Sequence, residues 1–269
     1  MHNSLNTLEI ASHFICELCL KAGEKILEVY NQENAPKIQR KNDRSPLTEA
    51  DLAAHHCIVD GLKALSPLPI LSEESSNIAW SERSTWQQYW LVDPLDGTKE
   101  FIKKNGEFTV NIALIDQGKP VFGVVYAPVL EQTYVGVVGQ GAYKLHKGER
   151  QAISPKAKQA NEPWRIVGSR SHQSPEIQAF LDNLDGESEL IAMGSSLKLC
   201  LVAEGAAHLY PRLGPTCEWD TGAAQAVVEA AGGKVTVVTD VATARSEQAV
   251  ALRYNQQESV LNPYFLVSY

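Results

Sequence analysis

The stretch from residue 91 to residue 101 constrains the fold of this chain more than any other. It reads Leu-Val-Asp-Pro-Leu-Asp-Gly-Thr-Lys-Glu-Phe and follows an aromatic, branched run that is typical of a buried strand. Pro94 lacks an amide donor and fixes its own φ, so a regular strand cannot continue through it. Gly97 permits a backbone turn that other residues resist. The stretch therefore predicts a buried strand that ends in a rigid turn, with a new element starting near Thr98.

Two carboxylates, Asp93 and Asp96, lie on this turn and can point at one cation. Hard cations such as Mg²⁺ prefer oxygen ligands and often share them with substrate phosphate. An ordinary strand–turn–helix explains the same residues, with Asp96 or Thr98 as the N-cap of a helix. Taken alone, the turn leaves a metal site and a helix cap as alternatives.

Further acidic residues occur at the ends of other predicted elements. A short apolar strand near 69–72 runs directly into Glu73 and Glu74. Thr48 and Asp51 have the spacing of a capping box at the start of a helix over 47–65. Asp51 is therefore either a helix-start residue or part of a functional site.

Asp220 precedes an alanine-rich helical run, 221–231, that stops at a glycine pair. We expect Asp220 to be the N-cap of that helix. A role as a metal ligand is compatible with this position, because a helix N-terminus faces anions such as phosphate.

The composition limits the class of protein and its partners. The chain has 269 residues, enough for one large domain or two small ones, and its net charge of −8 does not favour a nucleic-acid polymer or an anionic membrane as partner. We find no signal-peptide pattern and no apolar run of transmembrane length. Five scattered cysteines predict reduced thiols, and core packing on a helix explains Cys16 and Cys19. The expected location is the cytoplasm, with peripheral association at the inner face of the cell membrane left open.

Helical and strand patterns alternate along the whole chain, which predicts layers of α and β structure. The run 147–163 is polar and contains two prolines, so we expect a linker or an exposed loop there. Residues 116–119 read Asp-Gln-Gly-Lys, a hairpin turn. The expected helices are 4–30, 47–65, 175–184, 195–205 and 221–231; the expected strands are 69–72, 89–92, 109–116, 120–127, 132–138, 164–169, 206–210, 234–238 and 249–252.

Taken together, these motifs resemble the magnesium-dependent, lithium-sensitive phosphatases of the inositol monophosphatase superfamily. Within it, the chain is most similar to the bacterial 3′(2′),5′-bisphosphate nucleotidases. The resemblance rests on Thr48 with Asp51, the stretch 93–101, the stretch 219–233 and the ending Leu-Asn-Pro-Tyr-Phe at 261–265. Inside 219–233 the chain reads Thr-Gly-Ala-Ala where the family usually has an Ala-Ala-Gly core, a change that we expect to alter helix packing more than metal binding.

The resemblance implies a fold and a division of labour. The fold is an α/β (α+β) layered sandwich of αβαβα type, like that of inositol monophosphatase and fructose-1,6-bisphosphatase. The half 1–146 is expected to carry most metal ligands and the catalytic relay. The half 147–269 is expected to carry Asp220 and the substrate-recognition residues. Both halves form one compact catalytic unit with the active site between them.

The resemblance also implies a set of metal ligands. One Mg²⁺ ion is expected on Glu73, Asp93 and the backbone carbonyl of Leu95. A second is expected on Asp93, Asp96 and Asp220. Two metals that share a carboxylate suit in-line displacement at phosphorus. A third, water-rich Mg²⁺ near the neighbouring acid at position 74 is left open.

Three residues are expected to act in catalysis: Asp51, Thr98 and Glu73. In the relay implied by the resemblance, Asp51 accepts a hydrogen bond from the Thr98 hydroxyl, and Thr98 orients the attacking water. A hydroxyl is a poor base by itself, so the relay needs the carboxylate.

Substrate contacts are expected around the segment 194–200, where two serines and Lys198 begin a helix. A helix N-terminus with these side chains fits a second phosphate group, although a serine cap with a solvated lysine explains the same pattern. His172 and Arg212 are further candidates. The full expected substrate-binding set is Glu73, Leu95, Asp96, Gly97, Thr98, His172, Ser195, Lys198, Arg212 and Asp220.

The expected reaction is hydrolysis of adenosine 3′,5′-bisphosphate to AMP and phosphate, linked to sulfate assimilation. Lys99 and Glu100 resemble the nucleotidases, since inositol phosphatases commonly carry Thr-Asn there. The alternatives are an inositol or sugar phosphate monophosphatase and a non-catalytic regulator that binds metal or nucleotide. The expected partner is a small bisphosphorylated nucleotide, with no nucleic-acid polymer and no integral membrane segment; the oligomeric state stays open.

Overall fold

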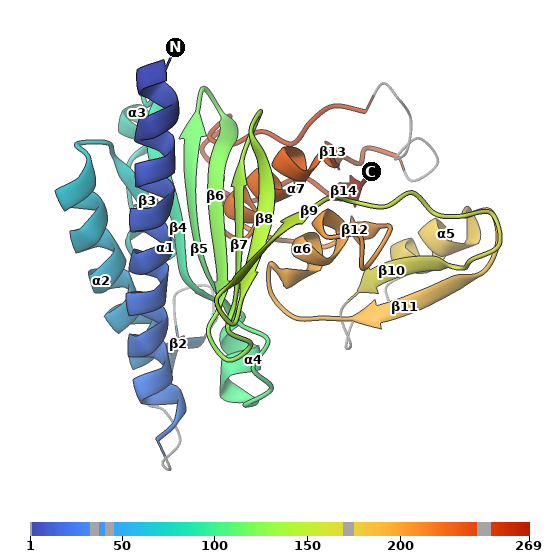
Figure 1. Ribbon diagram of the computed structural model, residues 1–269, viewed down its shortest axis with the longest axis horizontal. Helices are drawn as coiled ribbons and strands as arrows, with labels where there is room; N and C mark the ends of the chain where they lie inside the picture. Colours follow the sequence, from blue (N-terminus) through green and yellow to red (C-terminus); the bar gives the residue numbers. More distant parts are fainter. Residues whose placement is uncertain (1, 33–37, 41–45, 169–174, 241–248) are drawn as a thin grey trace.

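The computed structural model describes residues 2–32, 38–40, 46–168, 175–240 and 249–269. Two long helices, α1 (His2–Tyr30) and α2 (Glu49–Leu65), lie side by side on one face of a seven-stranded sheet. Two further helices, α6 (Leu197–Ala203) and α7 (Gly222–Ala231), lie on its other side, and smaller strands with α5 (Pro175–Asp182) follow beyond them (Figure 1). The predicted αβαβα layering is confirmed.

The seven-stranded sheet is antiparallel except at one edge, where β3 runs parallel to β4. The predicted hairpin between β5 and β6 is confirmed, with Gln117 and Gly118 both at positive φ (49° and 73°), as a tight two-residue hairpin loop requires. The strands in spatial order are β3 (Ile70–Ser72), β4 (Gln88–Asp96), β5 (Thr109–Asp116), β6 (Lys119–Ala127), β7 (Gln132–Val137), β8 (Gly141–His146) and β9 (Glu149–Ile153).

The outer helices bury one face each against this sheet. In α1, residues Ile15, Leu18, Ala22 and Ile26 repeat at helical spacing and are buried. Cys16 and Cys19 belong to the same core and are free thiols, which confirms that they serve packing. The start of α2 is the predicted capping box, so this end of the helix is fixed in position.

Helix α7 lies unusually close to the sheet, and this contact sets the position of the residues that precede it. A Cβ atom at Gly123 would lie 2.2 Å from the Ala223 carbonyl oxygen, and one at Gly136 would lie 2.5 Å from the Cα of Val227. Gly222 belongs to the Thr-Gly-Ala-Ala departure from the family pattern and faces Leu91 in the same way. A Cβ atom at this position would lie 2.7 Å from Leu91 Cδ2. Glycine at these positions lets α7 pack directly against β6 and β7 and against Leu91 of β4.

The C-terminal region contains two small sheets and several strands that the sequence did not predict. β12 (Tyr210–Arg212), β14 (Phe265–Ser268) and β13 (Lys234–Val237) form one sheet in that order, and β10 (Trp164–Gly168) pairs in parallel with β11 (Ser188–Ala192). The expected loop 147–163 is wrong at 149–153, which is β9. The expected strand 206–210 starts only at residue 210, and 249–252 contributes a single bridge.

Six short elements complete the described chain. A two-stranded ribbon, β1 (Ile38–Arg40) with β2 (Pro46–Thr48), precedes α2. The helices α3 (Trp80–Arg83) and α4 (Thr98–Ile102) flank β4 in sequence, and the 3₁₀ turns η1 (Glu73–Ser75) and η2 (Glu218–Asp220) follow β3 and precede α7. Among the described residues, no helix combines the length and apolarity needed to cross a bilayer.

Candidate active site

The turn at the end of β4 places two acids on an irregular piece of strand. The pairing of β4 with β5 shifts register between Asp93 and Asp96, so both side chains leave the regular alternation there. The Leu95 amide donates to Asp93 Oδ1 at 3.0 Å. Gly97, at φ 92°, occupies the N-cap position of α4 and has no capping side chain. The alternative in which Asp96 or Thr98 caps this helix is therefore wrong, and Asp96 is left for other contacts.

Three carboxylates meet at this point. One oxygen from each of Asp93, Asp96 and Asp220 lies within 4.8 Å of the others. Asp220 closes the turn η2, and its Oδ2 accepts a hydrogen bond of 2.8 Å from the Cys217 amide. The expectation that Asp220 caps the long helix is wrong, because Thr221 holds the N-cap position of α7. An extra short turn rotates the acid toward β4 instead.

The electrostatics of the cluster are those of a cation site. Burial raises the pKa of Asp93 well above its usual range, and the neighbouring acids raise it further. Burial raises the pKa of Asp96 to about 6, against the opposing effects of the Lys198 charge and the Ser196 amide. Burial and the Asp96 charge raise the pKa of Asp220 to about 8. These carboxylate oxygens converge and repel one another. A hard divalent cation bound between them would remove the repulsion.

Glu73 lies beside this trio on the turn η1, which directly follows β3. Its charge and a hydrogen bond to Asp93 both raise the pKa of Asp93, so the two carboxyl groups are neighbours. Glu74 lies on the same 3₁₀ turn and is also half-buried. Strand alternation, which would separate two adjacent acids, does not apply to a 3₁₀ turn, and the role of Glu74 stays open.

Asp51 and Thr98 come together from α2 and α4. The Thr98 hydroxyl lies 3.4 Å from Asp51 Oδ1 and 3.5 Å from the Leu95 carbonyl oxygen. The other carboxylate oxygen of Asp51 accepts from the Thr48 amide at 2.7 Å and from the Thr48 hydroxyl at 2.5 Å. Asp51 is fully buried. The two interpretations of Asp51 are compatible: one oxygen caps the helix and the other faces Thr98.

A second segment reaches the carboxylates from the C-terminal region. The Ser196 amide donates to Asp96 Oδ2 at 2.5 Å. The Ser196 hydroxyl lies 2.8 Å from Thr109 Oγ1 and 2.9 Å from Asn111 Oδ1, and Asn111 pairs opposite Asp93 in the sheet. Sequence reasoning gave Ser196 to a helix start that binds phosphate rather than to this interior contact, and it missed Thr109 and Asn111. Polar residues at positions that face a core were the available signal.

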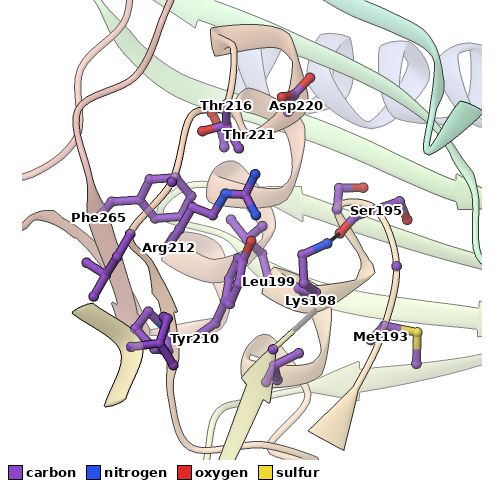
Figure 2. A pocket seen from close by; sticks show the side chains of 18 of the residues that line it. Met193, Ser195, Lys198, Leu199, Tyr210, Arg212, Thr216, Asp220, Thr221 and Phe265 are labelled. Atoms are coloured by element: carbon purple, nitrogen blue, oxygen red, sulfur yellow. Dashed lines mark hydrogen bonds between the residues drawn. The ribbon is translucent and has the colours of Figure 1, made fainter. Parts of the chain in front are cut away.

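Three cationic residues, Lys99, Lys198 and Arg212, line the same pocket as Asp96 and Asp220. The pocket measures about 520 Å³, and both Lys198 and Arg212 line it (Figure 2). Lys198 Nζ donates to the Ser195 carbonyl at 2.6 Å and lies 5.7 Å from the centre of the Tyr210 ring. Arg212 donates to the Pro215 carbonyl at 2.7 Å. Burial lowers the pKa of Lys198, and the Asp96 charge opposes that shift.

The segment around Lys198 differs from a simple serine cap. Helix α6 begins at Leu197, Ser196 holds the cap position but its side chain makes no capping hydrogen bond to the helix, and Ser195 has a positive φ of 47°. The solvated-lysine alternative is wrong, since Lys198 is half-buried in the pocket. His172 lies outside the described residues.

Part of the pocket wall is apolar, which the sequence reasoning did not anticipate. Most of these side chains come from β10, α5, β11 and β14, which are far apart in sequence, so no local pattern could reveal them. Figure 2 shows Met193 and Phe265 on opposite sides of the labelled cations. The apolar side chains that line the pocket are Ile166, Ile177, Leu181, Leu190, Met193, Leu213 and Phe265.

Comparison with known proteins places this site in a family. The model of the inositol monophosphatase family matches residues 8–262. The chain belongs to this family. It is 50% identical over 255 residues to the 3′(2′),5′-bisphosphate nucleotidase CysQ of Salmonella typhimurium, covering 94% of this chain and 98% of that protein. The CysQ protein of Escherichia coli K12 matches equally well, at 50% over the same length.

Solved structures of family members share the fold. The crystal structure of CysQ from Bacteroides thetaiotaomicron, 42% identical, superposes with a TM-score of 0.81 and covers 96% of each chain. An inositol monophosphatase of Staphylococcus aureus with bound 2′-AMP has a TM-score of 0.73 at 22% identity and supports the fold alone. The family assignment accounts for the three clustered carboxylates, which form an acidic metal-binding group.

Proposed function

We propose that this chain is a Mg²⁺-dependent 3′(2′),5′-bisphosphate nucleotidase that hydrolyses adenosine 3′,5′-bisphosphate to AMP and phosphate. One observation carries the proposal: Asp96 and Asp220 of the carboxylate cluster, a group of cations and several apolar side chains line a single pocket. A substrate with two phosphates and a nucleoside offers one group for each of these three surfaces. CysQ nucleotidases that match nearly the whole chain at 50% identity support the same assignment.

The cluster would hold the metal. Asp93, Asp96 and Asp220 supply carboxylate oxygens, Glu73 stands next to Asp93, and the Leu95 carbonyl lies on the same turn. Mg²⁺ bound there supplies charge that neutralises phosphate oxygens and makes a water molecule more acidic. We propose two such ions, as the family resemblance implies. Glu73, Asp96 and Asp220 each raise the pKa of Asp93, so Asp93 is close to all three and would be the ligand that both ions share.

Asp51 and Thr98 form the proton relay in this proposal. The Thr98 hydroxyl can donate to Asp51 Oδ1 while it accepts a hydrogen bond from the attacking water. The water proton then passes through the hydroxyl to the carboxylate. Because Thr48 holds one oxygen of Asp51, the oxygen that faces Thr98 keeps a fixed direction. Phosphoryl transfer depends on this kind of positioning together with charge stabilisation.

The uncleaved phosphate would bind at the cations. Lys198 has three N–H donors and spends one on the Ser195 carbonyl, so two remain for a phosphate. Arg212 likewise keeps donors beyond the one that it gives to Pro215. The apolar wall suits a nucleobase better than the polyhydroxylated ring of an inositol phosphate, which would leave its hydroxyls unpaired there. This difference favours the nucleotide over the inositol phosphatase alternative.

Phosphate release from a small substrate panel tests the proposal. Adenosine 3′,5′-bisphosphate, inositol 1-phosphate and fructose 1,6-bisphosphate should be compared at equal concentration, with Mg²⁺, with excess chelator and with added Li⁺. We expect the bisphosphate nucleotide to give the highest kcat/KM, with turnover lost in chelator and inhibited by Li⁺. Preference for inositol 1-phosphate would establish the sister phosphatase instead. Absence of turnover on every substrate would favour the non-catalytic regulator.

The setting of the reaction is part of the same proposal. Adenosine 3′,5′-bisphosphate arises as the by-product of sulfotransfer reduction in sulfate assimilation, so its hydrolysis would clear that product. We place the enzyme in the cytoplasm, where its five cysteines, all free thiols here, would stay reduced.

A further inference from the structure

The segment that ends the chain runs behind the turn that carries Asp220. The Asn262 amide donates to the Thr216 carbonyl at 2.9 Å, and the Glu218 amide donates to the Val260 carbonyl at 2.8 Å. An isolated antiparallel bridge pairs Cys217 with Leu261. The backbone of 260–262 is therefore fastened to the backbone of 216–218, immediately before the metal-site acid.

The side chain of Asn262 extends this contact to both sides of the turn. Its Nδ2 lies 2.8 Å from the Cys217 carbonyl oxygen and 3.0 Å from Thr221 Oγ1, with Thr216 Oγ1 at 3.3 Å. The residue is 9% exposed, and its Oδ1 has no hydrogen-bond partner within the described part of the chain. The amide thus works here as a donor that joins the residue before η2 to the residue after it.

Neighbouring residues hold this segment in place. The Tyr254 hydroxyl lies 2.6 Å from Gln225 Oε1 and 3.1 Å from Thr221 Oγ1, which ties it to the first turns of α7. The Asn255 amide donates to Glu218 Oε1 at 2.8 Å. The segment 254–262 therefore contacts the Asp220 turn at several independent points and is itself packed in the interior at Tyr254.

We propose that Asn262 is a positioning residue that fixes Asp220 for metal binding. Asp220 shares a small space with two other carboxylates, and like charges at this separation push apart. The hydrogen bond from the Cys217 amide holds one oxygen of Asp220, but this amide moves with the turn. Asn262 fixes the turn from behind by joining Cys217 to Thr221. The inference rests on the proposed role of Asp220 as a ligand and adds a residue with no contact to the pocket.

The variant Asn262→Leu tests the inference. Leucine has a similar volume but lacks the donors, and it removes the unpartnered Oδ1 as well, which limits the loss of stability. Mg²⁺ affinity of metal-free protein should be measured by calorimetry, together with the Mg²⁺ concentration that gives half-maximal activity. Residues that orient metal ligands typically change metal affinity by 10–100-fold, so we expect a Kd for Mg²⁺ about 10-fold weaker. KM for adenosine 3′,5′-bisphosphate at saturating Mg²⁺ should stay unchanged.

Tyr134→Phe is the matched control. It deletes a buried hydroxyl that contacts Glu204 at 3.1 Å, away from the Asp220 turn. A fold-wide effect would weaken Mg²⁺ binding in both variants, whereas a positioning effect weakens it only in Asn262→Leu. Equal Mg²⁺ affinity in wild type and Asn262→Leu overturns the inference. Failure of the wild type itself to bind Mg²⁺ overturns the proposed function instead.

A second pair of variants covers the case in which Asn262→Leu does not fold. Thr221→Val deletes the hydroxyl that accepts a hydrogen bond from Asn262 Nδ2, and Thr221→Ser keeps that hydroxyl. Weaker Mg²⁺ binding in Thr221→Val but not in Thr221→Ser supports the inference. Identical Mg²⁺ affinity in the two threonine variants contradicts it.

Discussion

Different backbone groups hold the carboxylate cluster and the cations of the pocket: main-chain amides hold the acids, and main-chain carbonyls hold the cations. Each acid of the cluster has one oxygen bound by a main-chain amide, from Leu95, Ser196 and Cys217 respectively. Lys198 and Arg212 instead donate to main-chain carbonyls. Backbone groups thus fix the direction of these five side chains and leave their remaining lone pairs or protons for ligands. The acids would hold metal in a rigid frame, whereas the two cations reach out on long side chains.

This difference predicts two classes of variant. Damage to the carboxylate cluster should lower kcat for every substrate, because all substrates use the same metal. Damage to the cation pocket should raise KM for substrates with a second phosphate and spare the others. The following experiments test that separation, in order of decreasing expected effect.

Asp96→Asn should have the largest effect. Asparagine keeps an oxygen that can accept from the Ser196 amide, so the fold is preserved while one charge of the metal site is lost. Loss of a single group that stabilises the transition state costs about 10²–10³-fold in kcat, and we expect the upper end here. Initial rates with adenosine 3′,5′-bisphosphate and inositol 1-phosphate at saturating Mg²⁺ measure it. A defect confined to one substrate would show that the cluster does not serve both.

Thr98→Ala should lower kcat by about 10²-fold, at the lower end of what general-base assistance contributes. The matched control is Thr98→Ser, which keeps the hydroxyl near Asp51 and should retain most activity. Combining Thr98→Ala with Asp51→Asn should add little further loss, since residues that act as one unit are not additive. A double variant whose defect equals the product of the single defects contradicts a shared relay.

Lys198→Met should separate the two regions most directly. The substitution keeps an unbranched apolar stem and removes the charge. A charge-assisted hydrogen bond contributes about 1.5–3 kcal/mol, or roughly 10–150-fold in affinity. We expect KM for adenosine 3′,5′-bisphosphate to rise in that range and KM for inositol 1-phosphate to change little. Lys103→Met, at an exposed position, is the control. Equal changes for both substrates would place the second phosphate elsewhere.

The sequence alone predicts the carboxylate cluster better than it predicts the rest of the pocket. The stretch 93–101 is contiguous, so its turn chemistry alone indicates both the bend and its acids. Local pattern also predicts where Asp220 lies. It wrongly predicts that Asp220 caps α7, because the extra turn η2 depends on contacts with residues 260–262. The apolar wall joins four distant elements and has no local signal. The strand β9 was missed because its residues are polar and it lies at a sheet edge.

The metal-free cluster should make stability depend on pH. The pKa values of Asp96 and Asp220 are raised to about 6 and about 8, so the folded protein binds more protons than the unfolded chain between about pH 4 and these values. Stability that depends on this protonation falls as pH rises, by about 1.4 kcal/mol per pH unit for each group. Urea unfolding in chelator measures this effect at pH 5 and pH 7. Between these two pH values, the free energy of unfolding of Asp220→Asn should increase by about 2–3 kcal/mol relative to that of the wild type.

Added Mg²⁺ should cancel this pH effect, because the cation replaces the protons. Apparent Mg²⁺ affinity should accordingly increase from pH 6 to pH 8. If the stability difference between wild type and Asp220→Asn is the same at both pH values, then Asp220 is not protonated in the metal-free protein.

The smallest expected effect distinguishes two adjacent serines that belong to different regions. The Ser196 hydroxyl contacts Thr109 and Asn111 in the interior, so Ser196→Ala should cost about 1–2 kcal/mol of folding free energy. Its amide still donates to Asp96, so kcat should fall less than tenfold. Within the described part of the chain, the Ser195 hydroxyl has only a 3.5 Å contact with the Leu197 amide, and Ser195→Ala should change stability by less than about 0.5 kcal/mol. Its effect should appear in KM for the bisphosphate, since Ser195 lines the pocket beside Lys198. Urea unfolding and steady-state kinetics on the two variants measure both quantities. If both serines change the same quantity, the segment 194–198 works as one unit, and the boundary between metal support and substrate recognition does not pass between them.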